Sequence, residues 1–537
     1  MTCGLYPCPN CPNRGGPKVG SKGDPNSPFL IIGESPGKQE LADKEKRPFI
    51  GPSGKVLDHS IRKIREAGIE PYFINAIMCN PGVAEDKDEE MMQNAIRICR
   101  HHVLEEINRA PRKIILALGA GALWSVSDHY DFRITQQRGK ILPTPLAEIG
   151  VVPTVHPAFL LRDGKGVSAQ QYFRDVDYAI DLFKGAQPKQ PPKVEYTVLQ
   201  SVREIHSLAR LIKHVGLVAA DIETHNLQPL DGYILCIGIA FHPRHVYVIP
   251  EHLVKFAAPL FQDDIEYVWH NGQYDVKWIR EHLGVPARVD QDTILLSYAL
   301  DEKGGIYSLD IVANDWLGSP NWEGEIRKYL PKQDSPYSLV PRDELHKYMA
   351  YDIGNTLAAF YILRERVRQN KHLEKLYTKL LIPATNFLAG VELHGLYVDQ
   401  KRVDENEVEY LAAIADARKE IIEFGKAFPN SGYTDKLPGS HQQLKRLIYD
   451  DLKMPMWKNK RSTDRKVMEH LPDHPLLRSL SKHRKVAKEY GTYVKAIRKH
   501  TQRDNRVHSS ISLYKTRTGR LASNEPNVQN VPRNPKI

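Results

Sequence analysis

The sequence predicts a multidomain α/β protein whose C-terminal part is mostly helical. In the first part of the chain, apolar runs at residues 29–35, 72–78, 113–119 and 150–157 alternate with helical stretches, which is typical of an α/β sheet. A second set of apolar runs, at residues 217–224, 233–241, 245–250 and 265–271, is predicted to form strands and is followed by helix-rich sequence. From about Tyr377 onward, the pattern is nearly all helical and increasingly charged.

The boundary between the first two regions lies in the sequence GAQPKQPPKVE, at residues 185–195. Four of these eleven residues are Gly or Pro, and no hydrophobic period runs through them. We therefore predict an N-terminal domain at residues 1–185, a linker at 186–193, and a second domain from residue 194 to about residue 370.

Charge is distributed unevenly along the chain. Residues 441–537 contain 23 Lys and Arg against 8 Asp and Glu, a net charge of +15, whereas the preceding 440 residues contain 52 against 57. A basic segment on a nearly neutral body indicates a polyanionic partner, and nucleic acid is the partner we expect.

The sequence contains no run of eighteen or more apolar residues, so we expect no transmembrane helix and no membrane partner. The N-terminal segment MTCGLYPCPNCPNRGG has no apolar signal region. The expected compartment is therefore the cytoplasm.

The cysteines are concentrated near the N-terminus, where five of the six lie within the first hundred residues. Six cysteines in 537 residues are too few for a disulfide scaffold. Cys8 and Cys11 form a CxxC pair, and with Cys79 and Cys99 they provide four thiolates that suit zinc or an iron–sulfur cluster. Spacing alone does not choose between these two alternatives.

Four motifs follow one another in the N-terminal region: GESPGKQE after an apolar run, then RPFIGPSG, NAIMCNP and HPAFLLR. Together they resemble the family 4 uracil-DNA glycosylases, the iron–sulfur branch of that superfamily, over about residues 8–184. The resemblance implies an α/β/α uracil-glycosylase-like domain with a [4Fe–4S] cluster on Cys8, Cys11, Cys79 and Cys99. Cys3 is left over, and the long gap between the third and fourth cysteines is a mild departure from the family.

This resemblance also implies roles for five residues. Enzymes of this kind flip the target base out of the DNA and into a pocket. Phe49 matches the aromatic residue that stacks on the base, and Asn75 matches the amide that reads the uracil edge with a donor and an acceptor. His156 matches the donor that stabilises negative charge on the leaving base. Glu34 and Glu40 match acidic positions expected to stabilise the sugar cation or hold water.

The middle region contains an ordered set of acidic residues. AADIETHNL places Asp221 and Glu223 two residues apart at a strand end, so both carboxylates point to one face. The motifs HNGQYD, QDTILLSYAL and YMAYD follow and supply the remaining polar residues, Asn271, Asp275, Asp292, Tyr348 and Asp352. With a Tyr four residues before the last Asp, the set resembles the DEDDy type of 3′–5′ exonuclease over about residues 194–368. The fold implied is a ribonuclease H-like α/β domain.

Four carboxylates can hold two divalent cations, one of which activates water while the other stabilises the leaving oxygen. We assign Asp221, Glu223, Asp275 and Asp352 as ligands of two Mg²⁺ ions, with Mn²⁺ as an alternative, because all the ligands are hard oxygens. Tyr348 is expected to orient the attacking water. We place Asn271 and Asp292 in the substrate-binding surround, where they support Asp275 or the strand.

The C-terminal region contains IPATNFLAGVELHGLYVD, GSHQQLKRLIYDDLKMP, RSTDRKVMEHL and HRKVAKEYGTYVKAI, which in this order resemble the thumb of a family A (DNA polymerase I type) DNA polymerase. The closing TRTGRLASNEPNVQN resembles the segment that enters the palm of that family. The resemblance implies a mostly helical thumb at residues 371–505 and the start of an incomplete palm at 506–537. It also implies a surface that contacts the primer–template minor groove, formed by Arg520, Asn527, Gln529 and Asn530.

As a whole, the chain resembles the front portion of a larger replication and repair enzyme with a glycosylase-like domain fused ahead of it. Such fusions occur in polymerases of some bacterial viruses, so a bacteriophage source and the host cytoplasm are expected. The expected DNA partners are primer–template DNA, single-stranded 3′ ends and uracil-containing DNA.

We find no segment in the chain with the two palm carboxylates of nucleotide transfer, so we do not expect it to extend a primer alone. Two alternatives stay open. In one, the N-terminal domain recognises DNA or uracil without cleaving, and the chain is one half of a split polymerase whose second polypeptide supplies the rest of the palm and the fingers. In the other, the chain is a truncated fragment.

Overall fold

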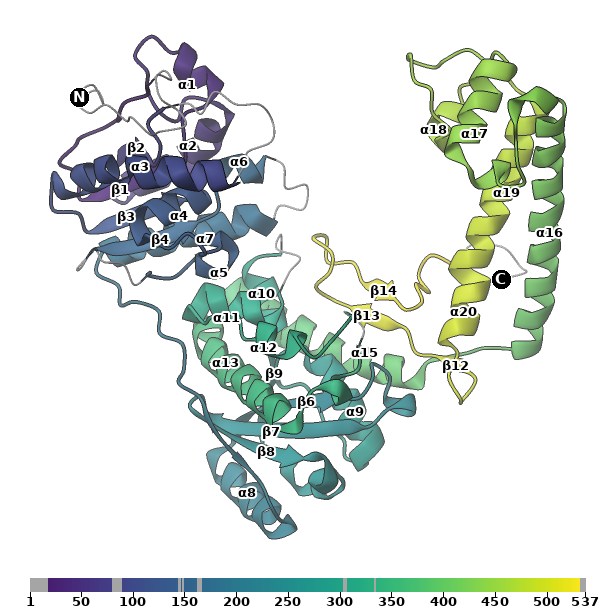
Figure 1. The fold of residues 1–537 in the computed structure, drawn as a ribbon. Helices are drawn as coiled ribbons and strands as arrows, with labels where there is room; N and C mark the ends of the chain where they lie inside the picture. Colours follow the sequence, from purple (N-terminus) through teal and green to yellow (C-terminus); the bar gives the residue numbers. More distant parts are fainter. Residues whose placement is uncertain are drawn as a thin grey trace. The chain divides into compact units, whose positions relative to one another are not determined.

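The computed structural model describes residues 18–79, 89–142, 146, 149–161, 167–302, 307–332 and 335–531. The chain divides into two compact units, and Figure 1 shows the course of the chain through both. The first unit contains Met1–Asn386 with Thr516–Thr518, and the second contains Phe387–Lys515 with Gly519–Ile537. In the described residues no helix is long and apolar enough to cross a bilayer.

The N-terminal domain is a parallel four-stranded sheet between two layers of helices. Its strands are β1 (Phe29–Gly33), β2 (Tyr72–Asn75), β3 (Ile114–Leu118) and β4 (Gly150–Thr154), and its longer helices are α2 (Pro52–Glu66), α3 (Glu89–Asn108), α4 (Gly119–Ser127) and α7 (Val167–Phe183). The strand order is β2-β1-β3-β4 with every pair parallel. Residues of α3 and α4 pack with Leu30 and Ile32 on one face, while α2 and α7 pack with Phe29 and Ile31 on the other. Because both faces are covered, β1 is apolar and buried throughout.

The second domain is built on a mixed six-stranded sheet in the order β10-β9-β6-β7-β8-β5. Its strands are β5 (Glu195–Val198), β6 (Leu217–Thr224), β7 (Ile234–His242), β8 (His245–Pro250), β9 (Glu266–Trp269) and β10 (Gln291–Asp292). Strands β6, β7 and β8 are antiparallel neighbours, and β9 joins β6 in parallel. The 27-residue helix α13 (Arg342–Arg368) packs across β6, β7 and β8. These two domains confirm the predicted α/β organisation.

The second unit is mainly helical, as predicted. Two long helices, α16 (Gln400–Lys426) and α19 (Pro475–Glu489), pack along each other (Figure 1). Ile421 of α16 and Leu480 of α19 belong to a core that also includes Leu444 and Leu447. A single π-helical turn at Leu447–Asp451 follows α17 (His441–Arg446), and another at Tyr490–Val494 follows α19. Hydrophobic periodicity does not predict such turns. Two short antiparallel strand pairs complete the unit, namely β11 (Leu396–Tyr397) with β12 (Arg506–Val507), and β13 (Ser510–Ser512) with β14 (Ala522–Asn524).

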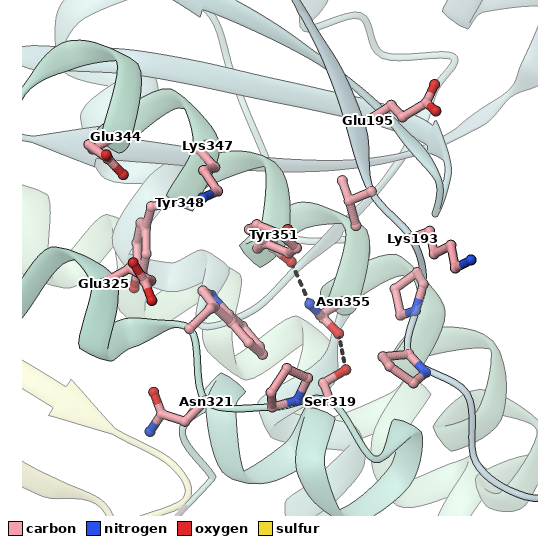
Figure 2. Close-up of a pocket in the computed structure, with 15 residues that line it drawn as sticks. Lys193, Glu195, Ser319, Asn321, Glu325, Glu344, Lys347, Tyr348, Tyr351 and Asn355 are labelled. Carbon is pink, nitrogen blue, oxygen red and sulfur yellow. Dashed lines mark hydrogen bonds between the residues drawn. The ribbon is translucent and has the colours of Figure 1, made fainter. Parts of the chain in front are cut away.

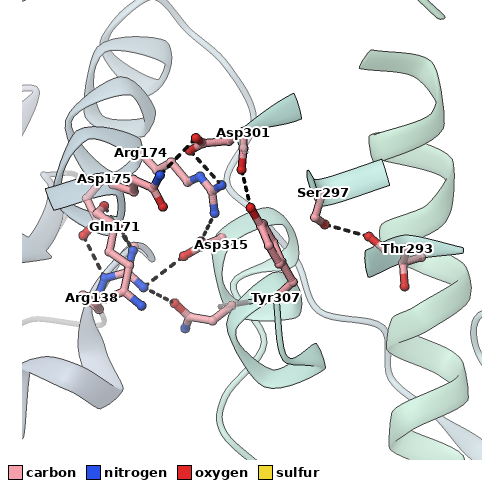
Figure 3. Close-up of polar contacts among 12 residues, drawn as sticks. Arg138, Gln171, Arg174, Asp175, Thr293, Ser297, Asp301, Tyr307 and Asp315 are labelled. Atoms are coloured by element: carbon pink, nitrogen blue, oxygen red, sulfur yellow. Dashed lines mark hydrogen bonds and ion pairs between the residues drawn. The ribbon is translucent and has the colours of Figure 1, made fainter. Parts of the chain in front are cut away.

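A buried ionic network joins the two domains of the first unit (Figure 3). Arg138, which follows the short helix α5 (Ile134–Gln137), makes two bonds of 2.8 and 3.1 Å to Asp175 on α7. The same guanidinium donates at 2.9 Å to Asp315 on α11 (Leu309–Leu317), which belongs to the second domain. Arg174 also pairs with Asp315. Because the Arg138, Asp175 and Asp315 side chains are at most 4% exposed, the contact is part of the interior.

Replacing Arg138 is therefore expected to destabilise the first unit. Arg138→Met leaves two buried carboxylates short of a counter-charge, and breaking a buried pair costs about 3–5 kcal/mol. Arg65→Met, which removes an exposed pair with Glu70, is the matched control and is expected to cost about 1 kcal/mol or less. Urea denaturation followed by circular dichroism measures both changes in the free energy of unfolding. Equal destabilisation by the two variants would contradict the conclusion that the Arg138 network stabilises the first unit.

Candidate functional sites

Three carboxylates meet where β6 lies against α13. Oxygens of Asp221, Glu223 and Asp352 all lie within 4.8 Å of one another. Asp221 and Glu223 share a face because side chains alternate along β6, and α13 crosses that face. Glu223 and Asp352 are buried and Asp221 is half-buried. The structure thus brings together three of the four predicted metal ligands.

Asp275, the fourth predicted ligand, lies beside this cluster in the first turn of α9 (Gly272–Leu283). Its Oδ1 accepts a hydrogen bond of 3.3 Å from the backbone N–H of Ile222, the residue between Asp221 and Glu223. Its carboxyl group also contacts that of Asp221. Asp275 is therefore in contact with the cluster, although it does not belong to the group of three whose oxygens all meet.

Burial raises the pKa of every carboxyl group at this site, and repulsion between the groups adds to it for Asp221, Glu223 and Asp352. The pKa of Asp221 rises well above its ordinary value through burial and the charge of Asp275. The pKa of Glu223 is also raised well above its ordinary value, first by burial and then by the charges of Asp221 and Asp352. The pKa of Asp352 is raised in the same way by burial and by the charge of Asp221. Burial raises the pKa of Asp275 to about 7. Oxygen ligands that repel one another in this way are stabilised by divalent cations, so the donor set fits Mg²⁺.

Tyr348 lies one turn before Asp352 on α13. Burial, followed by the charges of Asp352 and Glu223, raises the pKa of the Tyr348 phenol well above its ordinary value. The hydroxyl therefore stays protonated at neutral pH and can donate a hydrogen bond to a nucleophile or a phosphate oxygen.

Asn271 and Asp292 support the framework of the site. Asn271 precedes α9 in the left-handed conformation, at φ 69°. Asp292 is 2% exposed and accepts from the backbone N–H of Gly272 at 2.8 Å and from Ile294 at 2.8 Å. These bonds fix the start of α9, where Asp275 lies. The oxygens of Asp292 are occupied by backbone N–H groups, which is compatible with a supporting role; that role stays a prediction.

One cavity borders the carboxylate cluster, and a second lies beyond Trp322 and Tyr348. One of about 760 Å³ is lined by Glu223, Thr224, Tyr274 and residues 335–337. The other, of about 540 Å³, is lined by Tyr348, Asn355, residues 191–195 and a tryptophan, Trp322 (Figure 2). Trp322 donates its indole N–H to Asp352 Oδ1, and no motif in the sequence indicated this contact. The cavity lined by Glu223 is large enough for one nucleotide-sized group next to the carboxylates. The other cavity reaches the cluster only through Trp322 and Tyr348.

A second candidate site lies at the carboxyl ends of the parallel strands of the N-terminal domain. Asn75 ends β2, Glu34 follows β1, and His156 follows β4. A Cβ at Gly33 would lie 2.5 Å from both Asn75 Oδ1 and Phe49 Cζ, and a Cβ at Gly121 would lie 2.6 Å from Glu34 Cγ. The glycines thus leave room for the predicted residues to converge, as ligand sites at the carboxyl ends of strands require.

The polar atoms of this site are prepared for a ligand. Asn75 is 4% exposed, and its buried Nδ2 has no hydrogen-bond partner among the described residues. A buried amide that lacks a partner is costly, so it fits a position that a base carbonyl occupies. His156 Nδ1 accepts from the backbone N–H of Ala158 at 3.2 Å. The proton of the neutral ring therefore lies on Nε2, which makes Nε2 a donor.

The Glu40 carboxylate bonds to the backbone of two loop residues. Its Oε2 accepts from the backbone N–H of Gly37 at 2.8 Å, and its Oε1 accepts from that of Phe49. Phe49 itself lies in the left-handed region at φ 60°. Because both Glu40 oxygens bond to backbone, Glu40 fixes the loop that carries Phe49, and the structure does not aim it at a sugar.

Only part of the predicted cysteine set is described. Cys99 is buried on α3. Cys79 follows β2, and its backbone pairs with that of Lys18 in an isolated antiparallel β-bridge. Cys3, Cys8 and Cys11 lie outside the described residues. The geometry of a four-cysteine site therefore stays a prediction.

The predicted minor-groove residues lie at the C-terminal strand pair of the second unit. Arg520 is exposed between β13 and β14. Gln529 Oε1 accepts from the backbone N–H of Ser523 at 3.1 Å, and Asn527 Oδ1 accepts from that of Gln529 at 3.1 Å. Tyr493 donates its hydroxyl to the carbonyl of Asn530. Residues 532–537 lie outside the described part of the chain.

Three family models match consecutive parts of the chain. They describe the uracil DNA glycosylase superfamily at residues 21–177, a 3′–5′ exonuclease at residues 196–368, and DNA polymerase family A at residues 405–536. These matches confirm the predicted order of glycosylase-like, exonuclease and polymerase regions.

Curated relatives include polymerases of phages and bacteria. The chain is 27% identical over 353 residues to the DNA polymerase of Escherichia phage T5, covering 60% of this chain and 41% of that protein. It is 24% identical over 603 residues to the DNA polymerase of Bacillus phage SP01, covering 95% and 63%. It is 26% identical over 354 residues to DNA polymerase I of Borreliella burgdorferi, covering 63% and 38%. The chain thus spans between about two fifths and two thirds of the length of these relatives.

A solved structure shares the fold of part of the chain. It is the POL domain of Pol1 from M. smegmatis in complex with DNA primer-template and dNTP, with a TM-score of 0.51 and 19% identity over 64% of this chain and 57% of that one. The comparisons do not favour the alternative of a non-catalytic N-terminal module in one half of a split polymerase.

Proposed function

We propose that this chain, which combines a uracil DNA glycosylase superfamily domain, a 3′–5′ exonuclease domain and a family A DNA polymerase region, removes nucleotides from DNA 3′ ends during replication. The observation that carries the proposal is the cluster of Asp221, Glu223 and Asp352, with Asp275 against it, inside the region matched to exonucleases. These carboxylates would hold two Mg²⁺ ions, which would supply an activated water and stabilise negative charge on the leaving oxygen.

The residues of the chain prepare the remaining parts of the reaction. The protonated Tyr348 hydroxyl orients the attacking water by hydrogen bonding. The cavity lined by Glu223, Thr224 and Tyr274 receives the terminal nucleotide. Asn271 and Asp292 hold the start of α9, so that Asp275 keeps its place when a cation binds.

The polymerase region is proposed to bind primer–template DNA and to present single-stranded 3′ ends to the exonuclease site. Its excess of Lys and Arg supports this proposal, as do relatives that are DNA polymerases. Because those relatives come from phages and bacteria, we infer that the protein acts in the cytoplasm of a bacterial host. A second polypeptide that supplies the rest of the palm and the fingers stays a prediction.

The N-terminal domain is proposed to excise uracil from DNA. Support comes from the unpartnered Asn75 amide, from the Nε2 donor of His156, and from Phe49, held by Glu40 beside Asn75. In this proposal Asn75 reads the base edge, Phe49 stacks on the base, and His156 stabilises the anion of the departing uracil. A [4Fe–4S] cluster on Cys8, Cys11, Cys79 and Cys99 is proposed to be a structural part of the same domain.

The exonuclease assignment predicts Mg²⁺-dependent release of mononucleotides from a labelled 3′ end. Asp221→Ala combined with Glu223→Ala is expected to lower the rate by orders of magnitude, because it removes two metal ligands. Asp264→Asn, at an exposed carboxylate paired with Lys213, is the control and should behave as wild type. Since the double substitution relieves repulsion, the metal-free variant should be at least as stable as wild type. Unchanged activity in the double variant rules out this site.

The glycosylase assignment predicts alkali-labile sites in DNA that contains a single deoxyuridine, in EDTA so that the exonuclease is silent. His156→Ala is expected to suppress cleavage by about 100-fold or more, as loss of a donor to a developing anion does. His129→Ala, at an exposed histidine of the same domain, serves as the control. Binding of uracil DNA without any alkali-labile product would instead favour a recognition module.

The cluster assignment predicts that protein purified without oxygen is brown and contains about four iron atoms per chain. Cys79→Ser or Cys99→Ser should reduce the iron content strongly, whereas Cys3→Ser should leave it unchanged. Iron and zinc are quantified together by inductively coupled plasma mass spectrometry. Stoichiometric zinc without iron would show that the cysteines bind zinc and hold no iron–sulfur cluster.

A further inference from the structure

Trp322 makes a direct contact with the carboxylate cluster, although it comes thirty residues before Asp352 in the sequence. It lies at the start of α12 (Glu323–Arg327) and is 7% exposed. Its indole Nε1–H donates to Asp352 Oδ1. An indole N–H is a donor only, so it can neither bind a cation nor take a proton from the site. Its effect on the cluster is therefore exerted through Asp352.

The segment that carries Trp322 is anchored to α13 independently of this bond. Ser319 Oγ donates to Asn355 Oδ1 at 2.5 Å, and the amide of Asn355 donates to the carbonyl of Tyr351 at 2.8 Å, as Figure 2 shows. Asn314 of α11 donates to the carbonyl of Ser319 at 3.2 Å. Because Ser319 is held at both its side chain and its carbonyl, the approach of Trp322 to Asp352 is fixed by neighbouring structure.

Hydrogen bonds from Trp322 and from Tyr348 hold Asp352 against the repulsion of its neighbours, and only the bond from Trp322 comes from outside α13. The charges of Asp221 and Glu223 repel it across distances below 4.8 Å. A carboxylate with one oxygen bound to a fixed donor cannot rotate freely, and its second oxygen keeps one direction. Such orientation of a metal ligand by a hydrogen-bonding partner is worth about 10–100-fold in metal affinity.

We propose that Trp322 is a positioning residue of the exonuclease site: its indole N–H holds one oxygen of Asp352 and presents the other to a divalent cation, and so sets the affinity for that cation. The inference rests on the proposed exonuclease function. It adds to the site a residue other than the four carboxylates and Tyr348.

The test is Trp322→Phe, which keeps an aromatic ring and removes the N–H. Isothermal titration calorimetry of the metal-free proteins with Mn²⁺ is expected to show about 10–100-fold weaker binding in the variant. The Mg²⁺ concentration for half-maximal 3′ release should rise with it, and saturating Mg²⁺ should restore most of the rate. Trp316→Phe, at a half-buried tryptophan of α11 that stacks on Arg366, is the matched control and should bind Mn²⁺ as wild type does.

A variant in the Asp352→Ala background separates positioning from a general loss of structure. Because Trp322 acts through the carboxylate, Trp322→Phe should cause no further loss of Mn²⁺ affinity once Asp352 is absent. An equal loss in both backgrounds overturns the proposal, as does wild-type Mn²⁺ affinity in Trp322→Phe alone. Weaker Mn²⁺ binding by Trp322→Phe, in a protein whose wild type releases no mononucleotide, would instead keep the inference about the site and refute the proposed reaction.

Discussion

Mutual repulsion among clustered carboxylates is the constraint on which the second domain depends. Asp221, Glu223 and Asp352 share a space less than 5 Å across, and burial makes each costly to ionise. Because the carboxylates repel one another, their geometry is imposed by the surrounding elements and by donors such as the Trp322 indole. The alternation of β6, the helical period of α13 and the fixed start of α9 impose that geometry, and the apolar sheet beneath them offsets its cost. A divalent cation held by these oxygens would offset the repulsion between them.

The N-terminal domain reaches its site by a different principle. Its polar residues lie at the carboxyl ends of parallel strands. Glycines, which lack a side chain, provide the space in which these residues converge. Gly33 permits the approach of Asn75 and Phe49, and Gly119, at φ +87°, lies where a Cβ would meet His156 Cβ at 2.9 Å. The site therefore offers shape and hydrogen-bonding groups suited to a neutral base, whereas the other site offers negative charge suited to metal ions. Arg138 holds the two domains together without belonging to either site.

Several features could be predicted because their signal is local. The apolar strands and the pairing of Asp221 with Glu223 follow from residues adjacent in sequence, where a period of two decides the face of the sheet. Tyr348 and Asp352 are likewise one helical turn apart. Trp322 and Arg138 could not be found in this way, because their partners are thirty or more residues distant and neither is part of a repeating pattern. The bonds of Glu40 could not be predicted for a related reason, because the backbone N–H groups that it accepts from are brought to it only by the fold.

The measurement that tests this account most directly is the thermal stability of the metal-free protein with and without Mg²⁺. A ligand that binds only the folded state stabilises it by about 2.7 kcal/mol at one hundred times its dissociation constant. If the repulsion among the carboxylates is relieved by a bound cation, Mg²⁺ should raise the unfolding temperature of the domain that contains them. The same addition should leave the variant without Asp221 and Glu223 unchanged. An unfolding temperature that does not respond to Mg²⁺ in wild type, or responds equally in both proteins, would contradict the account.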